Sequence, residues 1–312
     1  MGTETVSQAG LAALEARLNS IIRGKPEAVR LAVATLLGRG HLLIEDVPGV
    51  GKTTLAFALA KAVDCTFQRI QFTSDMLPYD ILGVSILNPE TRDFEYRPGP
   101  VLANIVLADE INRTTPKTQS ALLEAMSERR VTLDRSTHLL PEPFMVIATQ
   151  NPIEYRGTFP LPESQLDRFA MHMKLGYPSA ADEKLAILEG KDFEDIEAME
   201  PVISTADVLR MQGEAAAVEI EDSLLDYLMA AVAATRTDER VRLGSSTRGA
   251  RFLLALARSR AYCAGRRYVI ASDIKDTAPY VLGHRIILRR QAYIAEAEDV
   301  VRDIVGRIAV PV

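Results

Sequence analysis

The chain has 312 residues, of which 47% are hydrophobic and 25% are charged, and its formal net charge is −6. This composition is typical of a folded protein with room for two domains, and it excludes a disordered chain and a generally basic nucleic-acid-binding protein. No apolar run approaches the roughly 18 residues of a membrane-spanning helix, and Cys65 and Cys263 form neither a disulfide nor a zinc pattern, so we expect a protein of the reducing cytoplasm without membrane insertion.

Two helices are predicted at the amino-terminal end, over residues 6–22 and 26–37, from the helical spacing of their apolar residues. The first residues lack the basic segment that opens a secretory signal. Ile22 and Gly24 lie at the junction of the two helices. This junction either lies against an adenine base or is a plain connection between helices, and both interpretations stay open.

A phosphate-binding loop is predicted between a short buried strand, Leu42 to Ile44, and the helix that follows it. Its glycines let the backbone turn with the N–H groups facing an anion, and the helix adds its positive dipole end. The lysine would reach the β- and γ-phosphates of ATP, and the first threonine would bind Mg²⁺. Asp46 stands where the general pattern has its first glycine. The residues predicted to bind the nucleotide are Pro48, Gly49, Val50, Gly51, Lys52, Thr53 and Thr54, with Thr53 also on the metal.

Residues 66–98 are predicted to add a strand to the core and then a segment outside it. Residues 66–72 alternate as in a strand, and residues 76–82 are predicted to form a short helix. The segment 84–98 holds two turn-forming runs, Asn88-Pro89-Glu90 within it and Arg97-Pro98-Gly99-Pro100 at its end. We therefore predict an irregular insertion there.

An acidic pair, Asp109 and Glu110, follows a buried strand of four apolar residues at 105–108. Parallel α/β sheets bind their ligands at the carboxyl ends of the strands, which is where this pair would lie. Asp109 is predicted to hold Mg²⁺, largely through water, and Glu110 to polarise the attacking water.

A third buried strand, over residues 144–149, delivers Asn151 to the same edge of the sheet. Its amide can hydrogen-bond both a γ-phosphate oxygen and the attacking water. Between this strand and the acidic pair, a helix is predicted over residues 117–129, and a hairpin from strands at 130–133 and 138–140.

Arg168 has two interpretations. It could form an ordinary ion pair within the chain, or it could project into the γ-phosphate of the next subunit in a ring and offset transition-state charge there. The two can coexist, with Asp167 orienting the guanidinium. A strand is predicted directly afterwards, over residues 170–175.

We place a domain boundary at residues 176–178, which divides the chain into domains 1–178 and 179–312. The second domain is predicted to be all-helical, with an acidic, solvated connection at 190–201. Arg248 lies in a first helical turn, where a cation is electrostatically disfavoured, so we predict that it closes on nucleotide phosphates rather than being a plain exposed arginine. The arginines of 236–290 could also form a nucleic-acid-binding face. The predicted helices cover residues 180–189, 205–213, 222–235, 247–265, 271–284 and 296–305.

Taken together, these motifs resemble the MoxR ATPases of the AAA+ superfamily. Asp46 fits this resemblance, because Glu-Asp-Val-Pro-Gly-Val-Gly-Lys-Thr is typical of that family. The resemblance implies an α/β AAA+ core, with a parallel sheet between helices, a helix-2 insert at 76–100 and a pre-sensor-1 hairpin at 130–143, followed by a separate all-helical lid. The segments that carry it are Val47 to Thr53, Ala108 to Arg113, Pro116 to Met126, Ala148 to Pro152 and Leu166 to Phe169.

The resemblance also implies roles and a function. It makes Asn151 sensor 1, Arg168 an arginine finger acting in trans, Arg248 sensor 2, and Ile22 to Gly24 part of an adenine pocket. It implies a Mg²⁺-dependent ATPase that assembles as a ring, expected to be hexameric, and remodels or matures partner proteins that carry a von Willebrand factor A domain. The catalytic residues are then Lys52, Glu110, Asn151 and Arg168.

Two other functions are considered. A nucleic-acid motor could use the arginine-rich second domain, but the acidic net charge disfavours it. A scaffold gated by nucleotide without turnover is disfavoured by the presence of Glu110 and Asn151.

Overall fold

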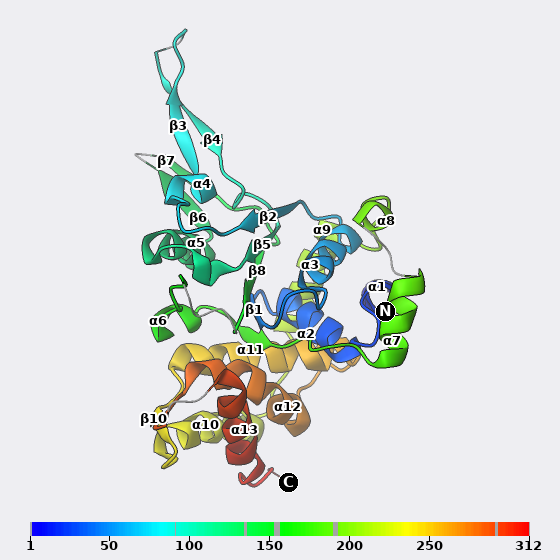
Figure 1. The fold of residues 1–312 in the computed structure, drawn as a ribbon. Helices are drawn as coiled ribbons and strands as arrows, with labels where there is room; N and C mark the ends of the chain where they lie inside the picture. The colour runs from blue at the N-terminus through cyan, green and yellow to red at the C-terminus, as the bar shows by residue number, and fades with distance from the viewer. Residues whose placement is uncertain are drawn as a thin grey trace.

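The computed structural model describes residues 2–90, 92–133, 136–152, 157–189, 193–290 and 293–311. Its centre is a parallel sheet of five strands in the order β2-β5-β8-β1-β9 (Figure 1). The middle strands are buried along most of their length, which is why they read as continuous apolar runs in the sequence. The strands are β1 (Leu42–Glu45), β2 (Phe67–Gln71), β5 (Ile105–Asp109), β8 (Met145–Gln150) and β9 (Met171–Met173).

Helices cover both faces of the sheet. Because successive strand residues point to opposite faces, Leu42 and Ile44 pack into one apolar core while Leu43 packs into another. The first core contains residues of α1, α2 and α3, and the second contains residues of α4 and α5. This is the predicted layering of an α/β domain. The helices are α1 (Gly2–Ile21), α2 (Pro26–Leu37), α3 (Lys52–Ala62), α4 (Pro78–Leu82) and α5 (Pro116–Glu128).

Two β-hairpins extend from the side of the sheet that carries α4 and α5 (Figure 1). The hairpin of β6 (Arg130–Leu133) and β7 (Ser136–Leu139) confirms the prediction for this stretch. The prediction of an irregular insertion is wrong, because β3 (Gly83–Leu87) and β4 (Phe94–Pro98) form a regular antiparallel ladder. The turn-forming residues mark the tip and the end of this hairpin, and Asn88 closes its tip through backbone hydrogen bonds with Asp93 and Arg92.

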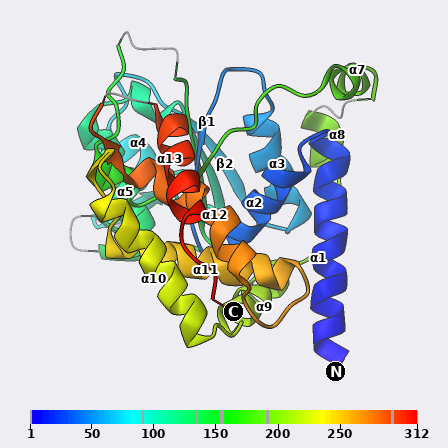
Figure 2. The same cartoon turned by 90° about the horizontal axis from the view of Figure 1, so that it is seen from below.

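The second half of the chain is helical, as predicted, and lies against the sheet domain (Figure 2). It also contains a small antiparallel sheet, β10 (Val241–Leu243) with β11 (Ile287–Leu288), so it is not all-helical. These strands are two or three residues long and have too few residues for a recognisable alternation. The principal helices are α9 (Thr205–Ala216), α10 (Asp222–Thr237), α11 (Thr247–Cys263), α12 (Ala271–Leu282) and α13 (Ile294–Gly306), with a 3₁₀ turn η2 (Gly283–Arg285) after α12.

Between the two halves lie α7 (Ala180–Glu189) and α8 (Phe193–Glu197). The described part of the predicted solvated connection is mostly exposed, but Ile196 of α8 is buried against the core that contains α3. Residues 190–192 of that predicted connection lie outside the described residues. The apolar core of α1, α2 and α3 continues without interruption into α9 to α13, so the helical part packs on the sheet domain. Among the described residues, no helix is both long and apolar enough to cross a membrane.

Candidate active site

The loop between β1 and α3 has the backbone of a phosphate-binding loop. Gly49 and Gly51 have φ values of 84° and 93°, which side-chain-bearing residues rarely adopt. A Cβ atom on either glycine would meet no other atom within 4 Å, so the space beside both residues is open. The loop runs directly into the amino terminus of α3 at Lys52. Open space beside a helix amino terminus with unpaired N–H groups suits an anion such as a phosphate.

Lys52 is folded back over this loop. Its Nζ donates to the backbone oxygen of Asp46 at 2.5 Å and to that of Val47 at 3.1 Å. Burial lowers the pKa of Lys52, while the nearby charges of Asp46, Asp109 and Glu110 act to raise it. The ammonium group therefore lies between the loop and the acidic pair, where a bound triphosphate would carry its charge.

Asp46 fastens the phosphate loop to the segment that leaves β9. Its Oδ2 accepts hydrogen bonds from the backbone N–H groups of Leu175, at 2.9 Å, and Gly176, at 2.6 Å. Its Oδ1 accepts from the N–H of Val47 at 2.8 Å. A glycine at this position could make none of these bonds, which gives a physical reason for the departure from the general phosphate-loop pattern.

We expect the Asp46→Ala variant to lose about 1–3 kcal/mol of unfolding free energy, because it leaves the buried N–H groups of residues 175 and 176 without an acceptor. Urea unfolding followed by circular dichroism measures this loss. Asp46→Asn is the matched control, because its amide oxygen still accepts one bond and should restore part of the stability. An alanine variant as stable as the wild type would show that these bonds contribute nothing.

Asp109 ends β5 and is almost completely buried. Its Oδ1 accepts from the Thr149 hydroxyl at 2.6 Å, and its Oδ2 accepts from Nη2 of Arg69 at 2.7 Å and from Nε at 3.2 Å. Arg69 comes from the neighbouring strand β2. Groups from the two neighbouring strands therefore hold the carboxylate in one orientation.

Glu110 follows in a left-handed backbone conformation, with φ of 58°. Such a conformation is uncommon for a residue with a side chain and is concentrated at functional sites. The N–H of Glu110 donates to the Thr149 hydroxyl at 2.9 Å. Its Oε2 accepts from Nε2 of Gln71 at 2.8 Å and faces Nε of Arg113 at 3.1 Å. In this structure the carboxylate of Glu110 is thus engaged by protein groups.

The oxygen donors at this edge fit a magnesium ion. Mg²⁺ is bound in nucleotide sites by one or two protein oxygens together with phosphates and water. Thr53, in the first turn of α3, offers a hydroxyl, and Asp109 offers a carboxylate that is already oriented. Within the described ranges, no group of three His, Cys, Asp or Glu side chains could hold a metal by itself.

Asn151 lies at the end of β8 and is buried. Since β8 pairs with β5 on one side and β1 on the other, Asn151 lies between the acidic pair and the phosphate loop. The sheet therefore brings five predicted residues to one edge, as the sequence analysis expected from their positions after three buried strands. These residues are Lys52, Thr53, Asp109, Glu110 and Asn151.

The junction predicted to contact adenine lies at the start of α7. Gly24 has φ of 71°, and a Cβ atom there would lie 2.4 Å from Oδ2 of Asp182. Nζ of Lys25 donates to the backbone oxygen of Tyr177. Ile22 is buried in the core. Gly24 is thus required by both its backbone conformation and this close approach, and its contact with a base stays a prediction.

Arg168 lies at the opposite edge of the sheet from the phosphate loop of its own chain. It follows α6 (Glu163–Leu166) and precedes β9, whose first residue, Met171, pairs with Leu42 at the start of β1. Nη1 of Arg168 donates to the backbone oxygen of Leu123 at 2.8 Å and to the hydroxyl of Ser127 at 2.5 Å, both in α5. The guanidinium therefore rests on α5, half exposed.

The prediction that Asp167 orients Arg168 is wrong. Its carboxylate instead accepts from the Ser246 hydroxyl at 2.9 Å and from Nε of Arg285 at 3.0 Å, and it lies 3.4 Å from Nη1 of Arg248. All three partners belong to the helical part of the chain, which tertiary packing brings to this edge. Arg248 is therefore placed beside residues 167 and 168 and away from the phosphate loop of its own chain.

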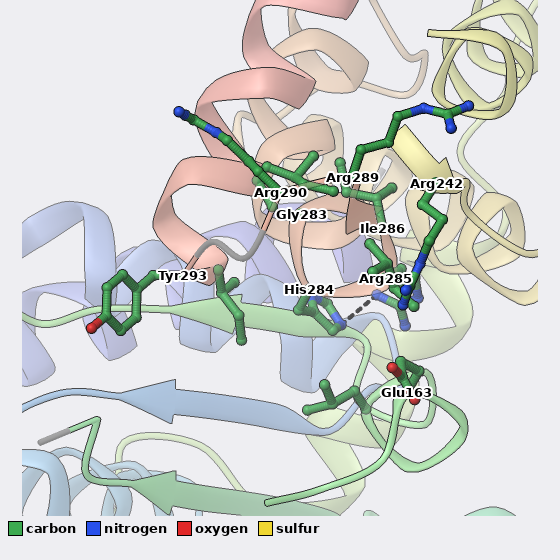
Figure 3. Close-up of a pocket in the computed structure, with 14 residues that line it drawn as sticks. Glu163, Arg242, Gly283, His284, Arg285, Ile286, Arg289, Arg290 and Tyr293 are labelled. Carbon is green, nitrogen blue, oxygen red and sulfur yellow. Dashed lines mark hydrogen bonds between the residues drawn. The ribbon is translucent and has the colours of Figure 1, made fainter. Parts of the chain in front are cut away.

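A cavity of about 400 Å³ lies at this edge, between α6 and the helical part (Figure 3). Its walls come from Glu163 and Leu166 of α6, from Arg242 of β10, and from the stretch that begins at η2. Nη1 of the buried Arg285 lies 2.6 Å from Nε2 of His284. This edge of the sheet, opposite the phosphate loop, thus has arginines beside the cavity. Such a surface is suited to contact with another molecule.

Several arginines of the predicted nucleic-acid face are paired with carboxylates of the same chain. Arg240 pairs with Asp303 at 2.7 Å, and Arg266 pairs with Asp273 at 2.7 Å. Arg290 also pairs, with Glu296 at 3.0 Å. Neutralised cations of this kind give little attraction to a phosphate backbone.

Sequence reasoning missed Arg69, Gln71 and Thr149. One signal was available for the first two: they are two residues apart in a predicted strand, so they share one face of it. The sheet order places this strand beside β5, which ends at Asp109 and is followed by Glu110. That order cannot be read from the local pattern. Nothing in the sequence separates Thr149 from other strand threonines.

Comparisons with known proteins agree with this geometry. Residues 41–171 match the family described as "ATPase family associated with various cellular activities (AAA)", and residues 233–305 match "AAA lid domain". The chain is 49% identical to "Uncharacterized protein YeaC" of Bacillus subtilis, over 95% of this chain and 93% of that protein. It is 42% identical to "Chaperone MoxR1" of Mycobacterium tuberculosis, over 93% and 80% respectively. It superimposes on a crystal structure of a protein from Cytophaga hutchinsonii with a TM-score of 0.88 and 36% identity, covering 99% and 97% of the two chains.

Proposed function

Because the chain belongs to the MoxR family of AAA ATPases, a membership that implies ATP hydrolysis, we propose that it hydrolyses MgATP in a ring of identical subunits and uses the reaction to remodel partner proteins. One observation carries the catalytic part of this proposal. The phosphate loop, the acidic pair and Asn151 follow three adjacent parallel strands and meet at one edge of the sheet.

Each of these residues has a distinct task in the proposed reaction. The loop N–H groups and Lys52 bind the β- and γ-phosphates, and Thr53 and Asp109 are the residues that would hold Mg²⁺. The ion, when bound, neutralises charge on the phosphate oxygens. Glu110 orients the attacking water, and the Asn151 amide contacts that water and a γ-phosphate oxygen. The remaining nucleotide contacts would come from Pro48, Gly49, Val50, Gly51 and Thr54, and from Ile22 and Gly24 at the adenine.

The positions of Arg168 and Arg248 support the proposed ring. Both lie at the amino edge of the sheet, whereas the phosphate loop lies at the carboxyl edge, so in this arrangement neither reaches the nucleotide of its own chain. Head-to-tail contacts between identical subunits close into rings when the rotation allows it. In such a ring, which we propose is hexameric, the amino edge of one subunit supplies both arginines to the nucleotide of the next.

The partner side of the proposal is supported by the similarity to Chaperone MoxR1. We propose protein remodelling or maturation in the cytoplasm, with clients that carry a von Willebrand factor A domain. Cys65 and Cys263 are both free thiols, as a reducing compartment would keep them. The proposed division of the chain, 1–178 for the ATPase core and 179–312 for the lid, places the two arginines on different domains.

The test is native mass spectrometry together with phosphate release, with and without MgATP. The proposal expects a nucleotide-dependent ring and a rate per subunit that rises with protein concentration as rings form. A chain that stays monomeric and hydrolyses ATP at a concentration-independent rate would refute the shared site. Retention on DNA at low salt would instead favour the nucleic-acid motor, because phosphate contacts are strongest there.

A further inference from the structure

A buried histidine connects the helical lid to the strand that enters the phosphate loop. His172, in β9, has a fully buried side chain. Its Nδ1 lies 2.6 Å from Oε1 of Glu298 in α13, and its Nε2 lies 3.3 Å from Oε2 of Glu45 in β1. The two carboxylates are themselves only 13% and 15% exposed. Three titratable groups from distant parts of the chain, Glu45, His172 and Glu298, thus share one nearly dry site, and we call them the triad.

The register of the sheet explains how the core side of this triad forms. His172 pairs with Leu43, so the two side chains lie on the same face of the sheet. Glu45 is two residues beyond Leu43 and shares that face. The lid side is set by close packing: a Cβ atom on Gly283 would lie 2.6 Å from Cγ of Glu298 and 3.1 Å from its Cα. Only a glycine at that position lets α13 approach far enough to reach His172.

We propose that His172 is a positioning residue for nucleotide binding, which holds a proton between Glu45 and Glu298 and thereby ties the position of α13 to the geometry of the phosphate loop. This inference rests on the proposed function at one point, the binding of nucleotide at that loop. An imidazolium donates from both ring nitrogens, whereas neutral histidine can donate from only one of them. A neutral His172 would therefore leave one buried carboxylate facing it without a proton between them.

A continuous set of contacts leads from the lid to the catalytic lysine. Glu298 contacts His172, and His172 faces Glu45. The next residue, Asp46, fixes the start of the loop, and its backbone oxygen accepts from Lys52. A shift of α13 away from the sheet would release Glu45 and, through it, the backbone on which Lys52 rests. By the same linkage, a nucleotide that binds Lys52 would favour the state in which His172 contacts both Glu45 and Glu298.

The charges around the triad favour a protonated His172. Burial lowers the pKa of His172, but its hydrogen bond with Glu298 and the nearby carboxylates of Glu298 and Glu45 outweigh this effect and raise the pKa above the ordinary value of 6.5. From η2, His284 faces it with ring centroids 6.0 Å apart, and burial, Arg285 and His172 lower the pKa of His284 well below the ordinary value, so that ring adds no charge. Arg285 is paired with Asp167, and from α12 Tyr280 interacts with Glu298.

The sign of the pH dependence follows from this direction. A group with a raised pKa in the folded state stabilises that state fully below its unfolded pKa, about 6.5, and loses this contribution as the pH rises through its folded pKa. These three groups should therefore hold the lid most firmly below about pH 6.5, and the hold should weaken as the pH rises through the raised pKa of His172.

The test measures the Kd for MgADP between pH 6 and pH 9 in the full chain, for the wild type and for His172→Gln. ADP avoids turnover and needs no arginine from a neighbouring subunit. We expect the variant to bind roughly 5- to 150-fold more weakly at pH 6, the range of a typical coupling between sites. The wild-type Kd should rise as the pH passes the raised pKa of His172, and the variant should lack this part of the rise. Any pH effect of Lys52 is common to both proteins. Equal Kd values and parallel pH profiles would overturn the proposal.

A second variant, Glu298→Gln, tests the same proposal if His172→Gln does not fold. Glu298→Gln keeps the shape of the side chain at the lid end of the triad and should weaken MgADP binding in the same pH-dependent way. Asp299→Asn is the matched control, because the neighbouring carboxylate is exposed and pairs with Arg302 on its own helix. Combining His172→Gln with Glu298→Gln should cost no more than the larger single change. Additive losses would overturn the proposal, and a wild type that binds no MgADP would refute the proposed function itself.

Discussion

Arg168→Ala is expected to lower ATP turnover by about 10³- to 10⁵-fold, the effect of removing an arginine finger, while leaving the Kd for nucleotide unchanged. The reason is positional. Arg168 lies at the amino edge of the sheet, so it contributes nothing to the loop that binds the nucleotide of its own chain. Phosphate release and MgADP titration measure the two quantities separately. Arg130→Ala is the control, because that arginine is exposed and pairs with Glu128 at the end of α5.

A mixing experiment decides between action in cis and in trans. A ring that contains both Arg168→Ala and Glu110→Gln subunits has some interfaces at which an intact Glu110 faces an intact Arg168. If the arginine acts in trans, the mixture of two nearly inactive proteins should regain a substantial part of the wild-type rate. A mixture as inactive as its components would show that both residues must belong to one chain, and the proposed interface would be wrong.

Glu110→Gln should reduce phosphate release by about 10²- to 10⁴-fold, the usual contribution of a general base, and should keep nucleotide binding. The amide still accepts the hydrogen bond that Gln71 donates to Oε2 of Glu110, so the local structure should persist. Rapid-quench analysis should find ATP bound and uncleaved. Glu142→Gln, at an exposed carboxylate elsewhere on the domain, is the control.

The outcome also separates an ATPase from a nucleotide-gated scaffold. In the present structure Glu110 is held by Gln71 and Arg113, so turnover requires this carboxylate to be released toward the attacking water. Gln71→Ala should therefore not mimic Glu110→Gln, because it removes the restraint and not the base. A Glu110→Gln protein that releases phosphate at the wild-type rate would remove Glu110 from the mechanism.

The strands and the order of the site residues along the chain were predictable from local patterns. The apolar runs before Asp109 and Asn151 are long enough to identify buried strands, and the glycines at 49 and 51 identify a loop with a specific backbone conformation. These signals are local because they depend on residues a few positions apart. The hairpin at 84–98 is not evident from local patterns, because turn-forming residues lie within it and at its end.

By itself, then, the sequence determined the α/β architecture, the phosphate loop and the presence of an acidic pair and an asparagine at strand ends. Only the tertiary structure decided which charged groups meet. Asp167 bonds to Arg285 across 118 positions, His172 to Glu298 across 126, and Arg69 to Asp109 across 40. Such contacts depend on which strand lies beside which and on where the lid packs. Those properties follow from burying all the apolar surfaces at once, and no local pattern encodes them.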